Sequence, residues 1–396
     1  MRTGWESAPI GDICDVVNGG TPKTGVAEYW GGPHRWITPA EMGRRPTPYI
    51  DQTDRTITDQ GLQNSSARPL PPYSVILSSR APIGHLVINT EPMATNQGCK
   101  GLVPRSRIDH KFLYYYLGSI VDLLNDLGTG ATFKELSGGK LKEVQVPLPP
   151  VPEQRRIVAI LDEAFEGIAT AKANADKNLQ NARDVFESHL AAVFSARNVG
   201  WTDRPLHSLC RRITVGHVGS MANLYKPAGI PFLRSQNIRP FSVSMQNLVF
   251  IDEEFHATLG KSSLQAGDVA IVRTGYPGTA AVIPESLGVA NCSDLVIVRP
   301  GPEIDAYFLT AFFNSSFGKS MVSGKVVGAA QKHFNVGAAK DVVLHLPPLA
   351  KQQAIVLAAD ELREETNRLQ DICARKIAAL DELKKSLLHQ AFSGAL

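Results

Sequence analysis

Few side chains in this chain of 396 residues stand in an arrangement that could carry out covalent chemistry. Leu70–Tyr73, Leu-Pro-Pro-Tyr, is similar to the loop with which amino-methyltransferases hold a flipped base. Leucine, however, stands where a side-chain oxygen must accept the amino hydrogens. The Gly-Lys-Ser triplets at 260–262 and 318–320 end like a phosphate-binding loop, but the first glycine of that loop is replaced by phenylalanine. We therefore predict no catalytic residue, and a turn stiffened by Pro71 and Pro72.

The histidines and cysteines form no pattern typical of a metal site or a disulfide scaffold. The ten histidines and five cysteines are scattered singly, whereas thiolate zinc sites and disulfide-rich domains need closely spaced pairs. No apolar run approaches the roughly 18 residues of a membrane span, and the start of the chain has no apolar signal region. We expect a reduced, cytoplasmic chain with no metal, no resident cofactor and no membrane partner.

The chain contains an internal repeat that spans half its length. A segment that begins at Leu148 and another that begins at Leu346 share eight of sixteen residues without a gap, at an offset of 198. The same offset recurs near the ends of both halves, and an offset of 196 pairs Trp5 with Trp201. A constant offset at several separated places indicates a duplicated structural unit.

Each half begins with a region rich in Gly, Pro, Ser and Thr. Short β-branched runs between turn residues, such as Val269–Arg273 and Leu295–Arg299, are typical of a mixed α/β (α+β) domain with many loops. We predict two such globular domains, at residues 1–150 and 201–347. Between the repeated anchors the two halves have little identity, so the frame recurs while the loops differ.

Each half ends in a stretch that predicts a long helix. Pro152 suits the first turn of a helix, and apolar or small residues then recur at steps of four and three up to about Ser195. The same spacing recurs over residues 350–392. We predict helical regions at 151–200 and 348–396, each helix being roughly 60 Å long for about 40 residues.

The apolar stripe of each long helix needs a partner. Because the two helices are equal in length and a globular domain lies between them, we expect an antiparallel coiled coil that separates two domains related by an approximate two-fold axis. The alternative is that both stripes bind other subunits. The residues predicted to serve helix pairing or partner binding are Gln154, Ile157, Leu161, Ile168, Leu179, Phe186, Gln352, Ile355, Leu362, Leu369, Leu380 and Leu387.

The segment that opens the first long helix carries a family resemblance. Residues 146–157 read Val-Pro-Leu-Pro-Pro-Val-Pro-Glu-Gln-Arg-Arg-Ile. With Asn-Gly-Gly-Thr-Pro at 18–22, Trp-Ile-Thr-Pro at 36–39 and Ala-Thr-Asn-Gln-Gly at 94–98, the chain resembles, over essentially its whole length, the specificity subunit of type I restriction–modification enzymes. The second half departs from the pattern with Ala-Lys-Gln-Gln-Ala at 350–354, so charged contacts at the two helix starts need not be equivalent.

This resemblance implies a non-catalytic protein that reads double-stranded DNA. In such a subunit each globular domain recognises one half of a bipartite, asymmetric target. The paired helices hold the domains apart and dock two methyltransferase subunits, which bind S-adenosylmethionine and methylate adenine. Restriction subunits, two per assembly, can join and use ATP and Mg²⁺. The resemblance thus places every cofactor in a partner and none in this chain.

The charge balance is compatible with DNA binding without diagnosing it. Lys and Arg number 41 against 38 acids, and the surplus lies in the globular regions, with 15 against 14 in residues 1–150 and 13 against 10 in residues 201–347. This surplus has the sign needed for phosphate contact. Its small size indicates a modest intrinsic affinity that depends on partner subunits.

Base recognition needs side chains with two hydrogen-bonding groups, chiefly Arg or Lys for guanine and Asn or Gln for adenine. For each candidate the competing interpretation is a solvated surface residue or a bond internal to the fold. Arg80 and Arg273 follow strand-like runs at corresponding places, so a shared structural role competes there. The predicted DNA-contacting residues are Lys23, Arg44, Arg45, Arg80, Lys134, Arg234, Gln236, Asn237, Arg239, Arg273, Gln331 and Lys332.

Two other functions remain open at the level of sequence. One is a self-contained DNA methyltransferase or nuclease, and the other is a coiled-coil scaffold with no nucleic-acid role. The first would transfer label from S-adenosylmethionine to DNA without help, whereas we expect no transfer by the purified chain. The second would give no salt-dependent gel shift of the assembled complex on one defined sequence, whereas we expect such a shift.

The length of the helical region gives a first testable prediction. Four residues inserted into the helix predicted at 157–193 lengthen it by about 6 Å, which is nearly two base-pair steps of about 3.4 Å. We expect the non-specific gap between the two half-sites to widen while their sequences stay the same, as measured by methylome sequencing of the host. An unchanged gap with activity retained would contradict a spacing role for the helices.

Overall fold

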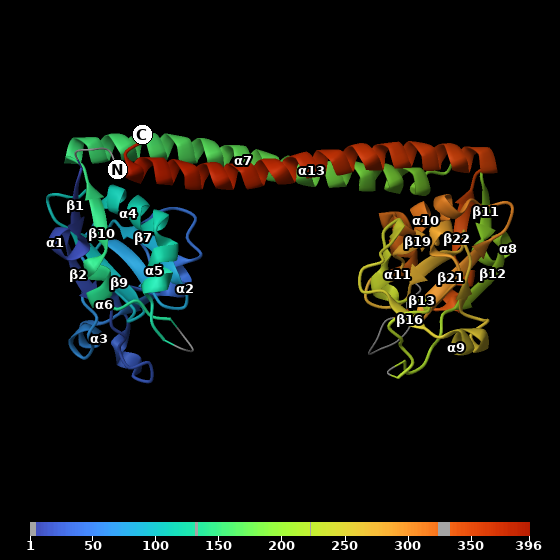
Figure 1. The fold of residues 1–396 in the computed structure, drawn as a ribbon, viewed down its shortest axis with the longest axis horizontal. Helices are drawn as coiled ribbons and strands as arrows, with labels where there is room; N and C mark the ends of the chain where they lie inside the picture. The colour runs from blue at the N-terminus through green and yellow to red at the C-terminus, as the bar shows by residue number, and fades with distance from the viewer. Residues whose placement is uncertain (1–4, 131–133, 222, 324–332) are drawn as a thin grey trace. The chain divides into compact units, whose positions relative to one another are not determined.

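The computed structural model describes residues 5–130, 134–221, 223–323 and 333–396. The chain forms two compact units. The first consists of Met1–Ala175 with Arg375–Leu396, and the second consists of Asp176–Ala374. Each unit combines one globular α/β domain with a part of each of two long helices (Figure 1).

The globular part of the first unit has two sheets and a two-stranded ribbon. The larger sheet has the strand order β2-β9-β6-β7-β4 and the smaller one β5-β3-β8, while β1 and β10 form the ribbon. The strands are β1 (Glu6–Pro9), β2 (Cys14–Asn18), β3 (Trp30–Ile37), β4 (Tyr49–Ile50), β5 (Arg55–Ile57), β6 (Val75–Ser79), β7 (Ile83–Asn89), β8 (Met93–Thr95), β9 (Cys99–Pro104) and β10 (Gln145–Leu148). The helices are α1 (Ile10–Ile13), α2 (Pro39–Met42), α3 (Asp59–Gln63), α4 (His110–Ser119), α5 (Val121–Leu127) and α6 (Gly138–Glu143), with a short 3₁₀ turn at Ala27–Tyr29.

The core of the first unit lies between the larger sheet and helix α4. All five residues of β6 are buried, as expected for a central strand that is covered on both faces. Helix α4 begins after Asp109, whose carboxylate accepts hydrogen bonds from the backbone N–H groups of Lys111 and Phe112. Phe112 packs with Leu77 of β6 and Leu102 of β9 in one apolar cluster. The cap therefore sets where α4 starts, and its apolar face decides that it lies on the sheet.

The second unit repeats this topology. Its sheets have the orders β12-β21-β18-β19 and β16-β13-β20-β17, and β11 pairs with β22 as a ribbon. The strands are β11 (Thr202–Pro205), β12 (Cys210–Val215), β13 (Ile230–Leu233), β14 (Ile238–Arg239), β15 (Ser242–Val243), β16 (Val249–Ile251), β17 (Ser263–Leu264), β18 (Val269–Val272), β19 (Ala280–Val282), β20 (Ala290–Cys292), β21 (Leu295–Pro300) and β22 (Val343–Leu346). The helices are α8 (Leu206–Leu209), α9 (Glu253–Thr258), α10 (Ala306–Asn314), α11 (Ser316–Ser323) and α12 (Val336–Lys340), with 3₁₀ turns at Ser235–Asn237 and Glu285–Leu287.

The predicted duplication and the mixed α/β fold are both confirmed. Strands β3 and β8 run parallel in the first unit, as β13 and β20 do in the second. Asp305 caps α10 as Asp109 caps α4, and Asn335 caps α12 as Ser137 caps α6. The chemistry of the caps thus recurs even where the surrounding residues differ.

The two predicted long helices are present. They are α7 (Val151–Ser195) and α13 (Leu349–Ser393), each 45 residues long. The first turns begin with backbone N–H groups that donate to Pro150 and Pro348, the residues just before each helix. No helix among the described residues is both long and apolar enough to cross a membrane.

Helices α7 and α13 pair in an antiparallel arrangement, as predicted. In the first unit Lys172 donates to both carboxylate oxygens of Asp381, at 2.8 and 2.9 Å. In the second unit Arg183 Nε donates to Gln370 Oε1 at 3.2 Å. Higher numbers on α7 thus face lower numbers on α13. The hydrogen bond from Lys172 lowers the pKa of the Asp381 carboxyl, so this ion pair is intact at neutral pH.

The pairing face agrees with the predicted stripe at most positions. The exception is Leu369, which is 43% exposed and therefore lies off the buried helix-pairing face, while its alternative role in partner binding stays a prediction. Thr366 is buried instead, with 3% exposure. Positions seven apart drift by roughly 20° per heptad on a straight α-helix, so the buried face moves away from Leu369. The buried predicted residues are Ile157, Leu161, Ile168 and Ile355, and the half-buried ones are Leu179, Phe186, Leu362, Leu380 and Leu387.

Gln154 and Gln352 do not lie on the helix-pairing face, which corrects that prediction. Both side chains are fully buried. Gln154 Oε1 accepts the backbone N–H of Asp109 at 2.8 Å, and its Nε2 donates to the carbonyls of Arg107 and Pro149 at 2.9 and 2.8 Å. One amide thus joins the start of α7 to the loop that caps α4. We call this set of three bonds the glutamine clasp.

The second unit contains the same glutamine clasp. Gln352 Oε1 accepts the backbone N–H of Asp305 at 2.9 Å, and its Nε2 donates to the carbonyls of Glu303 and Pro347, both at 2.9 Å. The amide oxygen and both amide N–H groups of the glutamine form hydrogen bonds in both units. The clasp therefore needs glutamine and no other residue type.

The five cysteine thiols are free. Burial raises the pKa of the Cys14, Cys99 and Cys210 thiols to about 12. These thiols therefore stay protonated at neutral pH, where a protonated thiol is a poor nucleophile.

Replacing Gln154 tests the clasp. We expect Gln154→Leu to lower the free energy of unfolding of the first unit by about 2 to 4 kcal/mol, because it leaves one buried carbonyl and two partly buried backbone groups without partners. Chemical denaturation followed by circular dichroism measures the change. The matched control is Gln353→Leu, at the exposed neighbour of Gln352, which should leave stability within about 0.5 kcal/mol of the parent chain. Equal stability of the two variants would contradict the clasp.

Candidate nucleic-acid interface

Three loops that carry the family resemblance lie together at one end of the first unit. Gly20 N–H donates to the Thr95 carbonyl at 2.8 Å, and Asn96 N–H donates to the Ile37 carbonyl at 2.8 Å. The Trp36 indole donates to the Gly20 carbonyl at 2.8 Å. Segments at 18–22, 36–39 and 94–98 are therefore bonded to one another, and we call them the first loop cluster.

Two glycines in the first loop cluster are required by close packing. A Cβ on Gly19 would lie 1.9 Å from the Asn96 carbonyl oxygen, and one on Gly20 would lie 2.3 Å from the backbone nitrogen of Ala67. Both contacts are with backbone, which cannot move aside. The Asn-Gly-Gly motif therefore sets how closely the three loops approach each other.

Polar side chains lie at the apex of the first loop cluster. Asn96 Oδ1 accepts the N–H of Gly98 at 2.8 Å, and its Nδ2 donates to the Thr21 hydroxyl at 2.9 Å. That hydroxyl donates in turn to the exposed Gln97 side chain. Gln97 was absent from the predicted DNA-contacting residues, although its place in the Ala-Thr-Asn-Gln-Gly segment was the signal that could have identified it.

The second unit builds its loop cluster on the same backbone bonds. His217 N–H donates to the Cys292 carbonyl at 2.8 Å, and Ser293 N–H donates to the Leu233 carbonyl at 3.0 Å. These bonds match those of Gly20 and Asn96 in the first unit. The frame is therefore common to the two units, while the side chains at its apex differ.

In the first unit several predicted arginines are already paired. Arg44 forms a 2.6 Å bond with Asp54 and is 69% exposed. Arg45 pairs with the buried carboxylate of Glu41 and donates to the Gln52 carbonyl at 3.1 Å. Lys23 and Lys134 are exposed. The surface lysines and Arg44 are thus accessible to a ligand, whereas Arg45 braces its own loop.

Some of the predicted DNA-contacting residues at 234–239 in the second unit are hydrogen-bonded inside the fold, and others are exposed. Arg234 donates to the Asn247 carbonyl at 2.7 Å. Asn237 is fully buried, and its amide bonds the N–H of Arg234 and the carbonyls of residues 244 and 246. Asn237 is therefore removed from the DNA-contacting candidates, because its hydrogen-bonding groups are used inside the fold. Gln236 and Arg239 are exposed.

Arg273 also has a partner within the fold. Its guanidinium donates to Asp294 at 2.9 Å, and its side chain is 15% exposed. Arg80, in contrast, is 36% exposed and lies 3.7 Å from a carboxylate oxygen of Glu135. Gln331 and Lys332 lie outside the described residues.

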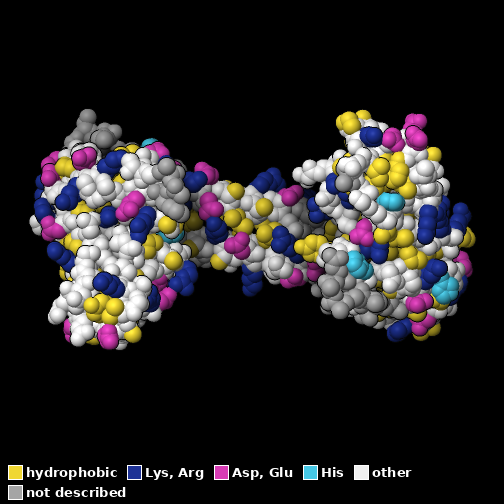
Figure 2. Space-filling model, turned by 90° about the horizontal axis from the view of Figure 1, so that it is seen from below, with side chains coloured by type: hydrophobic (Ala, Val, Ile, Leu, Met, Phe, Trp, Pro, Cys, Tyr) yellow, Lys and Arg dark blue, Asp and Glu magenta, His cyan; other side chains and the backbone are white. Residues whose placement is uncertain are grey.

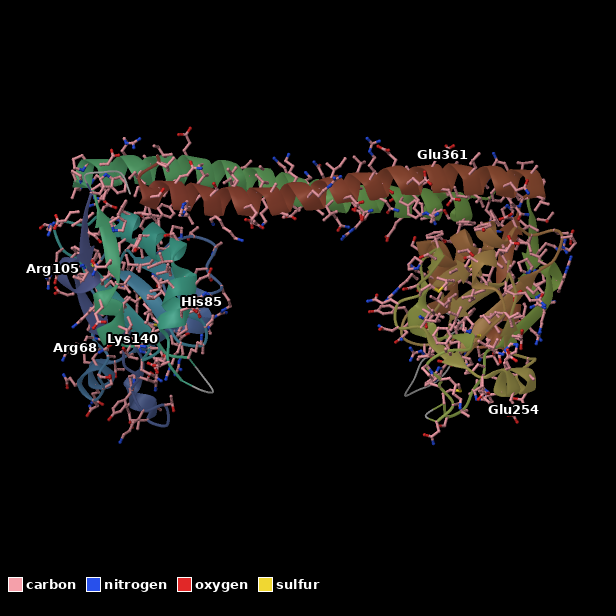
Figure 3. All side chains as sticks on the ribbon, in the orientation of Figure 1. Arg68, His85, Arg105, Lys140, Glu254 and Glu361 are labelled. Carbon is pink, nitrogen blue, oxygen red and sulfur yellow. The ribbon has the colours of Figure 1, made fainter. Side chains whose placement is uncertain are left out.

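Exposed basic residues of the first unit include one that sequence reasoning missed. Arg68 is exposed and follows Ala67, which packs against Gly20 of the first loop cluster. Figure 3 shows Arg68 in the half of the first unit that lies away from α7 and α13. Figure 2 shows Lys and Arg side chains mixed with Asp and Glu over the face of each unit that it displays. The charge pattern there favours contacts at individual sites over one continuous basic surface.

The segment at 70–73 is a turn, as the sequence predicts. The Asn89 side chain donates to the Pro71 carbonyl at 2.9 Å and accepts the N–H of Ser74 at 2.9 Å. The Ser74 hydroxyl closes the turn by donating to the Pro71 carbonyl at 2.7 Å. The leucine that opens the segment is buried in the core.

No group of three His, Cys, Asp or Glu side chains placed to hold a metal occurs in the described part of the chain.

Known proteins are similar to this chain in sequence and in fold. Residues 2–179 match the family described as type I restriction modification DNA specificity domain. A relative named the type I restriction enzyme MjaIX specificity subunit, from Methanocaldococcus jannaschii, is 30% identical over 63% of this chain, which spans 61% of that protein's length. These matches confirm the resemblance inferred from the repeated proline–glutamine segments.

The solved structures extend the likeness of fold to the whole chain. One chain from a structure titled "Structural basis underlying complex assembly and conformational transition of the type I R-M system" matches with a TM-score of 0.82 and 18% identity, covering 100% of this chain and 99% of that one. The HsdS subunit from Thermoanaerobacter tengcongensis matches with a TM-score of 0.64 and 18% identity, covering 100% and 98%.

Asn237 and Gln236 offer a test of which loop residues hold the fold. We expect Asn237→Ala to reduce the free energy of unfolding of the second unit by about 1 to 3 kcal/mol, because it leaves buried backbone groups without partners. Gln236→Ala, one residue away on the surface, should change it by less than about 0.5 kcal/mol. Urea denaturation of the two variants measures the difference, and similar values would contradict the bracing role of Asn237.

Proposed function

We propose that the chain is a member of the type I restriction–modification DNA specificity family, whose description matches residues 2–179, and that it is the non-catalytic subunit that reads a bipartite, asymmetric DNA target. The observation that carries the proposal is the repeated frame, in which identical backbone bonds present different side chains. His217 and Ser293 stand in the second unit where Gly20 and Asn96 stand in the first. Two readers built this way would recognise two unrelated half-sites.

The side chains available for reading suit base edges. Arg and Lys donate to the acceptors of guanine, and Asn and Gln bond both edge groups of adenine. Accessible residues of these types in the first unit are Lys23, Arg68 and Gln97, and in the second Gln236 and Arg239. Since the net charge is only +3, phosphate attraction alone gives limited affinity, and partner subunits supply the rest.

The partners we propose are two adenine methyltransferase subunits that hold S-adenosylmethionine. Restriction subunits, up to two, join through them and use ATP and Mg²⁺. The support within this chain is a pair of exposed aliphatic residues at equivalent positions of the repeat, Val185 on α7 and Leu383 on α13, which are 51% and 46% exposed. Val185 belongs to the second unit and Leu383 to the first. Because the two positions are equivalent in the repeat, they suit two copies of one partner. An assembly of this kind works in the cytoplasm.

Exchange of one globular domain tests the proposal. Residues 1–150 are replaced by the corresponding domain of another family member, and the chain is expressed with its methyltransferase. We expect one half of the methylated target to change and the other half to stay, because each unit reads its own half-site. Methylome sequencing gives both halves at once. Changes in both halves, or in neither, would sink the two-reader assignment.

The docking positions give a separate prediction. We expect Leu383→Glu and Val185→Glu together to weaken binding of the methyltransferase at least ten-fold, because charged groups would replace apolar contacts. Size-exclusion chromatography and calorimetric titration measure the binding. Helix content should be unchanged, since both side chains face solvent.

Asn367→Glu is the matched control. Asn367 is exposed and lies sixteen residues before Leu383, which places it about 160° away around the helix at about 100° per residue. We expect it to bind the methyltransferase like the parent chain. Equal binding by the double variant and the control would place docking elsewhere.

A further inference from the structure

The two units share one backbone hydrogen bond beside which their polar side chains differ. Leu136 N–H donates to the Ser79 carbonyl at 2.9 Å in the first unit, and Phe334 N–H donates to the Arg273 carbonyl at 3.1 Å in the second. The residues after Leu136 and Phe334 cap the equivalent helices α6 and α12. Arg273 therefore corresponds to Ser79.

The residues next to these bonds can then be matched between the two units. Arg80 corresponds to Thr274, and Glu135 corresponds to His333. The prediction that Arg80 and Arg273 stand at corresponding places is wrong by one position. Val75 and Val269 begin the equivalent strands β6 and β18, so Ser79 and Arg273 both stand four residues later, and Arg80 stands five residues later.

In the first unit this position is a cluster with excess positive charge. Glu135 lies between Arg80 and Lys100, with N–O distances of 3.7 and 4.0 Å. The Lys100 side chain is only 8% exposed. One carboxylate thus faces two cations, and both distances exceed that of a hydrogen bond. Donors of Arg80 remain available to a ligand with acceptor atoms.

The Arg80 side chain is also held at the first loop cluster. A Cβ on Gly98 would lie 3.1 Å from both Cγ and Nε of Arg80. Gly98 belongs to the Ala-Thr-Asn-Gln-Gly segment, so the arginine packs over that segment and its guanidinium lies at the edge of the loops that carry the family resemblance.

In the second unit the same position is centred on an acceptor. Asp294 accepts from Arg273 at 2.9 Å and from the Thr274 hydroxyl at 3.1 Å, and that hydroxyl lies 2.9 Å from Nδ1 of His333. The Asp294 side chain is 43% exposed. A carboxylate has about four acceptor positions, so the two bonds leave acceptor capacity facing solvent.

We infer that these two clusters determine specificity in the two half-sites, Arg80 by donating to a guanine and Asp294 by accepting from the exocyclic amino group of adenine or cytosine. Guanine presents two acceptors in the major groove, and adenine and cytosine each present an amino donor there. The inference rests on the proposed function and adds to it which residues read and which base class each reads. Thr274 and His333 in one unit, and Glu135 and Lys100 in the other, act as positioning residues.

The test is methylome sequencing of hosts that carry the chain with its methyltransferase. We expect Arg80→Ala to relax one guanine position in one half-site roughly ten- to hundred-fold and to leave the other half unchanged. Asp294→Asn should relax one adenine or cytosine position in the other half. Arg80→Lys keeps the charge facing Glu135 and can still donate to guanine, but it lacks the planar fork of arginine, so it should relax the same position less than Arg80→Ala does.

The controls separate this inference from a structural role and from the proposed function. Arg105→Ala removes another exposed arginine of the first unit, which pairs with Asp15 at 2.6 Å, and should leave the motif unchanged. Thermal unfolding of each purified variant with its methyltransferase reports stability independently of the motif. If the parent chain gives a bipartite motif and both Arg80 variants leave that motif unchanged, the inference is overturned while the proposed function stands. A parent chain that yields no bipartite motif overturns the proposed function.

Discussion

A buried glutamine amide at the start of each long helix determines how the rest of each unit is arranged. Gln154 and Gln352 each bond one backbone N–H and two carbonyls of their own unit. The glutamine side chains are fully buried and their partners are buried or partly buried, so a missing bond would cost desolvation of the orphaned group. The clasp thereby fixes the loop that caps α4 or α10 against the first turn of α7 or α13.

The side chains of the two loop clusters can differ because the loops are held mainly by backbone hydrogen bonds. The loops of each cluster are held mainly by backbone groups, as in the bonds made by Asn96 N–H and Ser293 N–H. Backbone bonds place few demands on side-chain identity, apart from the glycines that allow close approach. Side chains at the apex can therefore change without loss of fold. One scaffold can therefore present a different set of apex side chains in each unit.

Much of the fold could be predicted because its signals are local or repeated. The offset of 198 and the proline–glutamine segments gave both long helices, and the equal lengths gave their antiparallel pairing. The site was harder to predict. Asn237 has the residue type of a base reader, but it is buried and bonded to its own loop. Leu369 fits a heptad, but the drift of a straight helix leaves it exposed. Residue type alone suggested a base contact for Asn237, and spacing alone suggested a buried position for Leu369. The burial of Asn237 and the exposure of Leu369 contradict these expectations.

The sequence by itself determined that this protein is a duplicated α/β chain with two long helices and a family resemblance to DNA specificity subunits. These properties depend on periodicity and on repeated motifs, which are present in the order of the residues. Only the tertiary structure decided which polar groups are used inside the fold and which remain accessible, as with Arg273 and Arg80. It also decided which residues of the two halves correspond, because the backbone bonds of Leu136 and Phe334 match Ser79 with Arg273. Such properties depend on contacts between residues far apart in the chain, which no local pattern encodes.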